Sequence, residues 1–144
     1  MPVIFIVRGL PGAGKSTMAS GLAADAVSAD DYFMEGGVYK FDPSLLPAAH
    51  AACQQKARDI LASGRPVAVA NTFTQGWEIQ PYVKIAQETG VLMVVTDLFD
   101  GGLSDEALAD RNVHGVPVAT IRAMRARWER DWQKADPRPP WERG

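Results

Sequence analysis

The sequence predicts a three-layer α/β fold, in which a parallel sheet is flanked by helices and a helical lid follows on the C-terminal side. Unbroken apolar runs occur at residues 3–7, 66–70 and 91–96. Runs of this kind are typical of strands buried on both faces of a parallel sheet. Segments with helical patterns separate them, so the strands are joined by right-handed crossovers.

The length and composition indicate one folded domain. A chain of 144 residues is long enough to bury about two thirds of its unfolded surface. Its 47% hydrophobic and 22% charged content excludes a largely disordered chain. We expect the domain to span residues 1–135. Residues 136–144, which hold three prolines, are expected to form a flexible C-terminal tail.

The first strand leads directly into a glycine-rich loop. Residues 9–16 read Gly-Leu-Pro-Gly-Ala-Gly-Lys-Ser and match the spacing of a phosphate-binding P-loop (Walker A). Successive backbone N–H groups must point inward around a triphosphate, which a glycine-rich backbone permits without side-chain clashes. An ordinary glycine turn is the alternative, but the motif has a strand before it and a helix after it. The fold class is therefore a P-loop NTPase fold.

This loop predicts ATP and Mg²⁺ as cofactors. Lys15 is expected to bridge the β- and γ-phosphates and Ser16 to ligate the metal. Thr17 is a secondary candidate that faces the α-phosphate, and the start of the following helix adds its positive end. The predicted cofactor-binding residues are Gly9, Pro11, Gly12, Ala13, Gly14, Lys15, Ser16 and Thr17.

The elements after the loop follow from periodicity and breakers. Met18, Leu22 and Ala26 are expected to share a helix face, and a short strand is expected at 26–29. Residues 32–42 are irregular, with a turn at Gly36-Gly37. A helix then starts near Pro43 and stops at Gly64.

The second half repeats the alternation. Helices are predicted at 75–89, closed by Gly90, at 104–111, and from Pro117 onward. The single cysteine, Cys53, has no metal-ligand spacing and is expected to occupy a buried helix position.

Acidic residues follow the second strand. Asp30 is the candidate general base for an acceptor hydroxyl, because the carboxyl end of a neighbouring parallel strand is where such a group meets the nucleotide. Asp31 is a second candidate, and either residue can instead cap the next turn. The other predicted substrate-binding residues near these strand ends are Tyr32, Phe33, Asn71, Thr72 and Trp77.

These substrate-binding candidates have alternatives. Asn71 and Thr72 can bond the acceptor or the metal's water shell, or can form an Asx turn. Asp97 ends an apolar strand as a Walker B carboxylate does, or is simply a strand end. The aromatic residues near these loops can stack on a base or belong to the core. They are Tyr32, Phe33, Tyr39, Phe41, Phe73 and Trp77.

Basic residues concentrate at the C-terminal end. Residues 111–144 carry eight Arg or Lys against four acids, whereas residues 1–110 carry seven against thirteen. Such asymmetry can mark an anion-binding surface or a solvated helix face. In the lid, Arg111 and Arg122 are candidate catalytic arginines at the transferring phosphoryl group, and Arg125 is a candidate substrate contact. His114 lies in the loop between the lid helices.

The ordered motifs resemble the polynucleotide-kinase-type P-loop kinases. The resemblance rests on residues 9–17, Asp-Asp-Tyr at 30–32, Asn-Thr at 71–72, and Arg-Asn followed by Val-Pro at 111–117. It implies Asp30 as general base, Lys15 and Ser16 at phosphate and metal, and Arg111 or Arg122 near the lid. The implied activity is transfer of the γ-phosphate of ATP to an alcohol.

The chain also departs from that family. The phage 5′-end kinase has an arginine soon after its Asp-Asp-Tyr, where this chain has Phe33, and its lid has one more arginine than the stretch 113–115. Compact bacteriophage relatives phosphorylate hydroxymethylated pyrimidines in DNA. The resemblance therefore implies either a modified base, as in a 5-hydroxymethyluracil DNA kinase, or a polynucleotide 5′-hydroxyl as acceptor.

Other functions stay open. A nucleoside or sugar kinase and an ATP-gated binding module are the alternatives. The partners we expect are ATP and a DNA or other nucleic-acid acceptor, without a membrane or a disulfide-linked partner. The location we expect is the cytoplasm, that of an infected host if the protein is phage-encoded.

Overall fold

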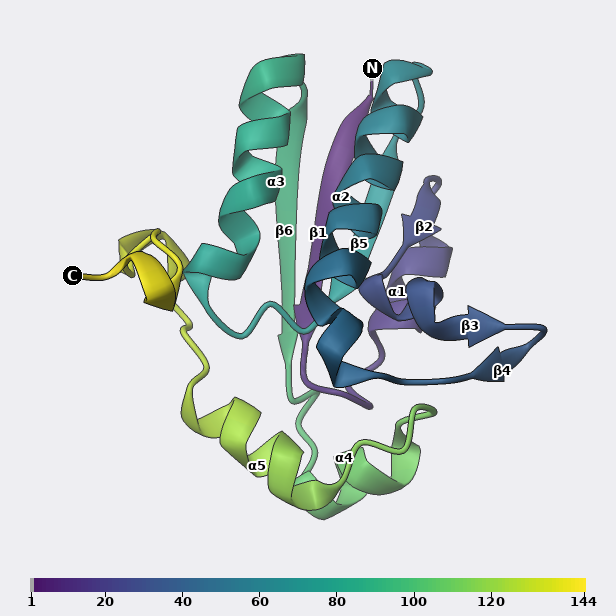
Figure 1. The fold of residues 1–144 in the computed structure, drawn as a ribbon, viewed down its shortest axis with the longest axis vertical. Coiled ribbons are helices and arrows are strands. Elements are labelled where there is room, and N and C mark those ends of the chain that lie inside the picture. Colours follow the sequence, from purple (N-terminus) through teal and green to yellow (C-terminus); the bar gives the residue numbers. More distant parts are fainter. Residues whose placement is uncertain (1) are drawn as a thin grey trace.

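A computed structural model describes residues 2–144 and contains a four-stranded parallel sheet (Figure 1). Its strands are β1 (Val3–Gly9), β2 (Asp25–Val27), β5 (Val67–Asn71) and β6 (Leu92–Phe99), in the order β2-β5-β1-β6. The neighbouring strands are all paired in parallel. The predicted α/β class with a parallel sheet flanked by helices is confirmed.

Two long helices cover one face of the sheet. They are α2 (Leu46–Ala62) and α3 (Gly76–Thr89), which lie side by side in Figure 1. The main core forms between them and the sheet and includes Ile4, Ile6 and Val69. Gly90 closes α3 in the left-handed conformation, as predicted, and Cys53 is buried in α2, also as predicted.

The opposite face carries the single short helix α1 (Lys15–Gly21), behind the sheet in Figure 1. It packs on a smaller core that contains Val7, Ala68 and Ala70. The prediction that Met18, Leu22 and Ala26 share one helix face is wrong. The helix ends at Gly21, Leu22 is already extended, and Ala26 lies in β2, because this crossover is only a few residues long.

The segment after β2 contains a hairpin that the sequence did not predict. A 3-10 turn (Ala29–Phe33) leads into β3 (Met34–Glu35) and β4 (Val38–Tyr39), which pair antiparallel around the predicted Gly36-Gly37 turn. A further 3-10 turn, Pro43–Leu45, leads into α2. The hairpin brings Tyr39 back toward the turn that carries Asp30.

Two further helices form the lid, which we define as α4 (Asp105–Arg111), α5 (Val118–Ala126) and the loop between them. Figure 1 shows the lid across the carboxyl ends of the strands. Pro117 is the N-cap of α5 rather than its first residue. A small core joins the lid to the glycine loop through Leu10, Leu108 and Ile121.

The segment predicted to be a flexible tail lies against α3. Two 3-10 turns, Trp132–Lys134 and Pro140–Glu142, shape the chain after the lid. Trp141 makes an edge-to-face contact with Trp77, at 5.3 Å between ring centroids. Among residues 2–144, no helix is long and apolar enough to cross a membrane.

Candidate active site

The P-loop connects β1 to α1 at the carboxyl edge of the sheet. Gly12 and Gly14 have φ values of 84° and 101°, which glycine adopts without steric strain. Leu10 N–H donates to the Phe99 carbonyl at 2.8 Å, and this bond ties the loop to the end of β6. No side chain caps α1, so no side-chain cap takes up the N–H groups of its first turn. The backbone therefore has the form that a phosphate site requires.

Lys15 lies at the start of α1 and folds back over the loop. Its Nζ donates to the Leu10 carbonyl at 3.1 Å. Burial lowers the pKa of Lys15 to about 8, and the charge of Asp30 partly opposes this shift. Lys15 follows β1 and Asp30 follows β2, so both residues lie at the carboxyl edge of the sheet, with β5 between their strands. Ser16 and Thr17 follow on the exposed side of the helix start.

The lid packs closely on the P-loop. A Cβ atom at Gly12 would lie 2.4 Å from the Leu108 carbonyl oxygen of α4. Arg111, at the end of the same helix, lines a hollow of about 480 Å³ with Gly14, Thr17 and Leu98. The structure thus brings one predicted lid arginine beside the predicted nucleotide-binding residues.

Asp30 and Asp31 have different surroundings. The Asp31 carboxylate accepts from Ser28 N–H at 3.0 Å and completes a capping box of the 3-10 turn. Asp30 instead accepts from the Tyr39 hydroxyl at 2.9 Å, and its other oxygen lies 3.4 Å from His114 Nε2. Both acids have exposed surface, and the Asp30 side chain is 45% exposed. Their partners distinguish them, because Asp31 bonds within its own turn and Asp30 faces the hairpin and the lid loop.

Aromatic rings surround Asp30. The rings of Tyr39 and His114 have centroids 4.1 Å apart and are tilted by 31°. Phe41 stacks on Tyr39 from another side at 6.2 Å. Burial, together with the bond to Asp30, raises the pKa of Tyr39. Sequence reasoning counted Tyr39 only among the general aromatics and did not place it against Asp30.

Two predicted substrate contacts in this region differ in exposure. Tyr32 is 45% exposed beside Asp31. Phe33 is 3% exposed and belongs to the core between the sheet and the long helices. The Phe33 ring is therefore in contact with its aromatic neighbours and not with the open side of the site. This burial corrects the sequence reading of Phe33 as a substrate contact.

Asn71 connects two strand ends. Its side-chain oxygen accepts from Ala29 N–H at 2.9 Å and lies 3.3 Å from Ser28 Oγ. The residue is buried at the end of β5, so it supports the turn that carries Asp30 and does not form the Asx turn considered above. Thr72 accepts from Gly9 N–H through its carbonyl at 3.3 Å and so adjoins the P-loop.

A buried arginine at the end of β1 is the main residue that sequence reasoning missed. Arg8 has no exposed surface and donates to the carbonyls of Phe73, Thr74 and Glu129. It also lies over the Trp128 ring, at 4.1 Å from the centroid. The only available signal was a charged residue that ends an apolar run just before the glycine loop.

Asp97 is the partner of this arginine. Its carboxylate accepts from Arg8 Nη1 at 3.3 Å, and the two residues are aligned across β1 and β6. A structural role in this ion pair is therefore an alternative to the Walker B interpretation of Asp97. Among residues 2–144, no group of three or more His, Cys, Asp or Glu side chains could hold a metal ion. Ser16 at the end of the P-loop fits a metal that also binds ATP phosphates.

The other lid arginines tie the lid together. Arg125 donates to Asp100 and Asp105, each at 2.7 Å, and to the Leu103 carbonyl. Arg122 is 60% exposed and pairs with Glu106 and Asp105. Neither arginine reaches the P-loop in this arrangement. The predicted contact of Arg125 with a substrate and the predicted role of Arg122 at the phosphoryl group therefore stay predictions.

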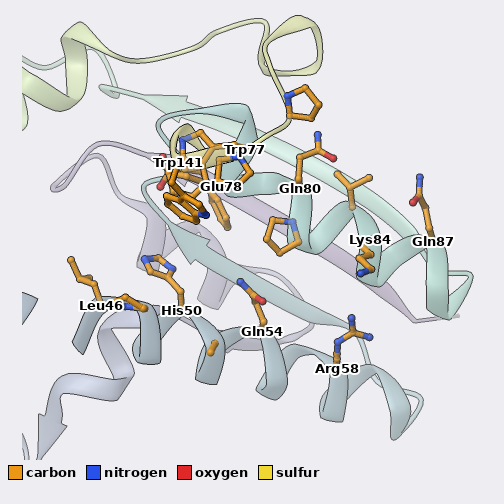
Figure 2. A pocket seen from close by; sticks show the side chains of 17 residues that line it. Leu46, His50, Gln54, Arg58, Trp77, Glu78, Gln80, Lys84, Gln87 and Trp141 are labelled. Carbon is orange, nitrogen blue, oxygen red and sulfur yellow. The ribbon is translucent and has the colours of Figure 1, made fainter. Parts of the chain in front are cut away.

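A larger hollow lies elsewhere, between α2 and α3 (Figure 2). It has a volume of about 1110 Å³ and is lined by Trp77, Trp141 and His50 at one end and by Arg58 and Gln87 at the other. Trp77 Nε1 donates to Gln75 at 2.9 Å. Trp77 therefore belongs to this groove, and the aromatic cluster at Asp30 does not include it.

The chain matches the AAA_33 family, described as an AAA domain, over residues 4–130. It belongs to this family. The match includes the P-loop and the lid.

NEDD4-binding protein 2 of Homo sapiens is 36% identical to this AAA_33 chain over 136 residues. The match covers 89% of the chain but only 8% of that relative. The chain therefore corresponds to a small part of the human protein.

Solved structures share the fold of this AAA_33 domain. A chain of the Pnkp1/Rnl/Hen1 RNA repair complex superposes with a TM-score of 0.72 at 20% identity, covering 96% of this chain and 47% of that one. A gluconokinase from Sinorhizobium meliloti gives a TM-score of 0.56 at 21% identity, covering 96% and 78%. At these identities the likeness shows the P-loop kinase fold alone.

Proposed function

We propose that this domain is an ATP-dependent kinase that transfers the γ-phosphate to a hydroxyl on a nucleic acid. The observation that carries the proposal is that the P-loop with Lys15 and the turn that carries Asp30 both follow parallel strands at the same carboxyl edge of the sheet. The effect of the Asp30 charge on the pKa of Lys15 agrees with this placement. A base beside the lysine that holds the γ-phosphate is the arrangement that phosphoryl transfer to an alcohol requires.

Each partner in the reaction has a place in this scheme. The P-loop backbone and Lys15 would hold the ATP phosphates, and the Ser16 hydroxyl would help to hold Mg²⁺, whose charge would stabilise the transferring group. Asp30 orients the acceptor hydroxyl and takes its proton. Arg111 lies beside the P-loop and is the lid arginine best placed to approach the phosphates. Closure of the lid excludes water that would otherwise hydrolyse ATP.

Two acceptors fit this proposal, a hydroxymethylated pyrimidine in DNA and a polynucleotide 5′-hydroxyl. The aromatic surroundings of Asp30 favour an acceptor that carries a base. The fold likeness to a chain of an RNA repair complex agrees with this class, and the likeness to a gluconokinase keeps a small-molecule alcohol as the second candidate.

The test is transfer from γ-labelled ATP with Mg²⁺ to three separate acceptors: DNA with a hydroxymethylated pyrimidine, DNA with free 5′-hydroxyls, and a panel of sugars and nucleosides. Labelled DNA in either of the first two supports the proposal. Label that enters only the small molecules replaces it with the second candidate. ATP hydrolysis without any labelled acceptor, together with nucleotide-dependent assembly, would instead indicate an ATP-gated binding module. Lys15→Ala is the matched control, because it should abolish transfer in every case.

A further inference from the structure

His114 contacts Tyr39 and Asp30 in the way that a bound ligand would, and it does not pack in a hydrophobic core. Its ring lies against the Tyr39 ring, with centroids 4.1 Å apart and a tilt of 31°, and its Nε2 lies 3.4 Å from the Asp30 carboxylate. A planar ring against Tyr39 with a polar atom close to Asp30 is also the pose that an acceptor base with a reactive hydroxyl would adopt. The imidazole therefore stands where the acceptor of the proposed reaction would have to lie.

The protein does not satisfy His114 in this position. Its Nδ1 is buried and has no hydrogen-bond partner among the described residues 2–144. A buried ring nitrogen without a partner is unfavourable, so the imidazole is not held as a well-bonded structural residue is. The Tyr39 hydroxyl, by contrast, makes a 2.9 Å bond to Asp30 and stays fixed without His114.

His114 can leave as part of the lid. Asn112 bonds the carbonyls of Leu108, Ala109 and Val116 and accepts from Val116 N–H, so the base of the loop is rigid. The loop tip is less constrained, since Val113 is 85% exposed and Gly115 has a φ of 68°. A small displacement of the tip separates the two rings and exposes the face of Tyr39.

We propose that Tyr39 is the stacking platform for a planar heteroaromatic ring that carries or adjoins the acceptor hydroxyl, and that His114 occupies this platform until the acceptor replaces it. This inference rests on the proposed function and narrows its substrate class. It favours acceptors with a base over sugars and sugar acids. It also predicts that Tyr39 strengthens acceptor binding and that His114 weakens it.

The test measures the KM for the acceptor, the KM for ATP and kcat separately. Tyr39→Leu should raise the acceptor KM at least 5-fold, in line with the loss of one base-stacking contact. Tyr39→Phe retains the ring, so its acceptor KM should stay within about 3-fold of the wild-type value. His114→Ala should lower the acceptor KM, because a competitor has been removed, and should leave the KM for ATP unchanged. Thermal unfolding of each variant serves as the folding control.

Opposite results would overturn the inference. A His114→Ala variant with reduced kcat and an unchanged or higher acceptor KM would make His114 a group that acts in the reaction. A Tyr39→Leu variant that unfolds like the wild type and has a normal acceptor KM would remove the platform.

A binding measurement separates this inference from the proposed function. Calorimetric titration with 5-hydroxymethyl-2′-deoxyuridine, without ATP, should give tighter binding to His114→Ala than to the wild type and weaker binding to Tyr39→Leu. This result supports the platform even if no DNA is phosphorylated. Equal binding to all three proteins contradicts the platform even if DNA is phosphorylated.

Discussion

The P-loop and the surroundings of Asp30 lie at the same edge of the sheet, yet they are built differently. The P-loop consists of eight consecutive residues, and its phosphate-facing surface is backbone. The surroundings of Asp30 combine the turn after β2, the β3–β4 hairpin, the end of β5 and the lid loop. The donor side therefore depends on local conformation, whereas the acceptor side depends on packing between distant segments.

Arg8 links the two sides. It precedes the P-loop directly, and its guanidinium bonds carbonyls that follow β5 and α5. The Phe73 carbonyl accepts from Arg8, and the Phe99 carbonyl accepts from Leu10 N–H. Both phenylalanines have a positive φ of 48°. Such conformations cost of the order of 1–3 kcal/mol each for residues other than glycine. The strand ends at this site are therefore held in strained conformations by their hydrogen bonds.

The largest expected effect separates the two neighbouring acids. Asp30→Asn should lower kcat for phosphoryl transfer by about 10²- to 10⁴-fold, because the amide cannot accept the acceptor's proton. Binding of ATP, measured by titration calorimetry, should stay close to that of the wild type. Asp31→Asn is the matched control and should cost about 1 kcal/mol of stability through its cap, with near-normal transfer. Near-normal transfer by Asp30→Asn would remove the base role from this residue.

The next effect tests the link between the two sides. Arg8→Met should lower the free energy of unfolding by about 3–5 kcal/mol, because several buried carbonyls lose their charged donor. Urea unfolding measures this loss. Arg122→Met, on the exposed side of the lid, should change stability by less than about 0.5 kcal/mol. Similar small losses for both variants would show that Arg8 does not hold the strand ends.

A smaller effect tests the contact between the P-loop and the lid. Gly12 and Gly14 both have positive φ, but only Gly12 faces a lid carbonyl. Both alanine variants should lose about 1 kcal/mol or more from backbone strain. Gly12→Ala should lose more, because its Cβ would overlap the Leu108 carbonyl. Thermal unfolding compares the two, and equal losses would mean that the lid does not rest on the loop.

The smallest effect is a pH dependence of ATP binding. Since the pKa of Lys15 is about 8, its positive charge is lost as the pH rises through this value. The dissociation constant for ATP should then rise by up to about tenfold per pH unit above 8. The Lys15→Arg variant keeps its positive charge over this pH range, so its dissociation constant for ATP should change little with pH, whether or not it binds ATP as tightly as the wild type does. A wild-type profile that is flat from pH 7 to 10 would contradict the lowered pKa.

Much of the fold could be predicted because its signals are local. The apolar runs gave the strands of the sheet core, and Gly64 and Gly90 marked the ends of the long helices. The errors occurred where few residues form an element. Ala26 fits a helix period and a strand equally well, and the two-residue strands of the hairpin are too short for any period to show.

The site was predicted in the same uneven way. The positions of Lys15 and Asp30 at the same edge of the sheet follow from motif order and from the geometry of parallel sheets. The expectation that their strands are neighbours is wrong, because β5 lies between β1 and β2. The partners of Asp30 do not, since Tyr39 and His114 lie 9 and 84 residues away in the sequence. Asn71 was found for its position, but its bond to Ala29 N–H required the fold.

The sequence by itself determined the P-loop of this protein, because residues 9–16 form it through a backbone conformation that consecutive residues specify. Only the tertiary structure decided which acid faces the site, which arginine is buried, and what covers the Asp30 carboxylate. Those outcomes depend on contacts between segments far apart in the chain, and such contacts leave no periodic or spacing signal in one sequence.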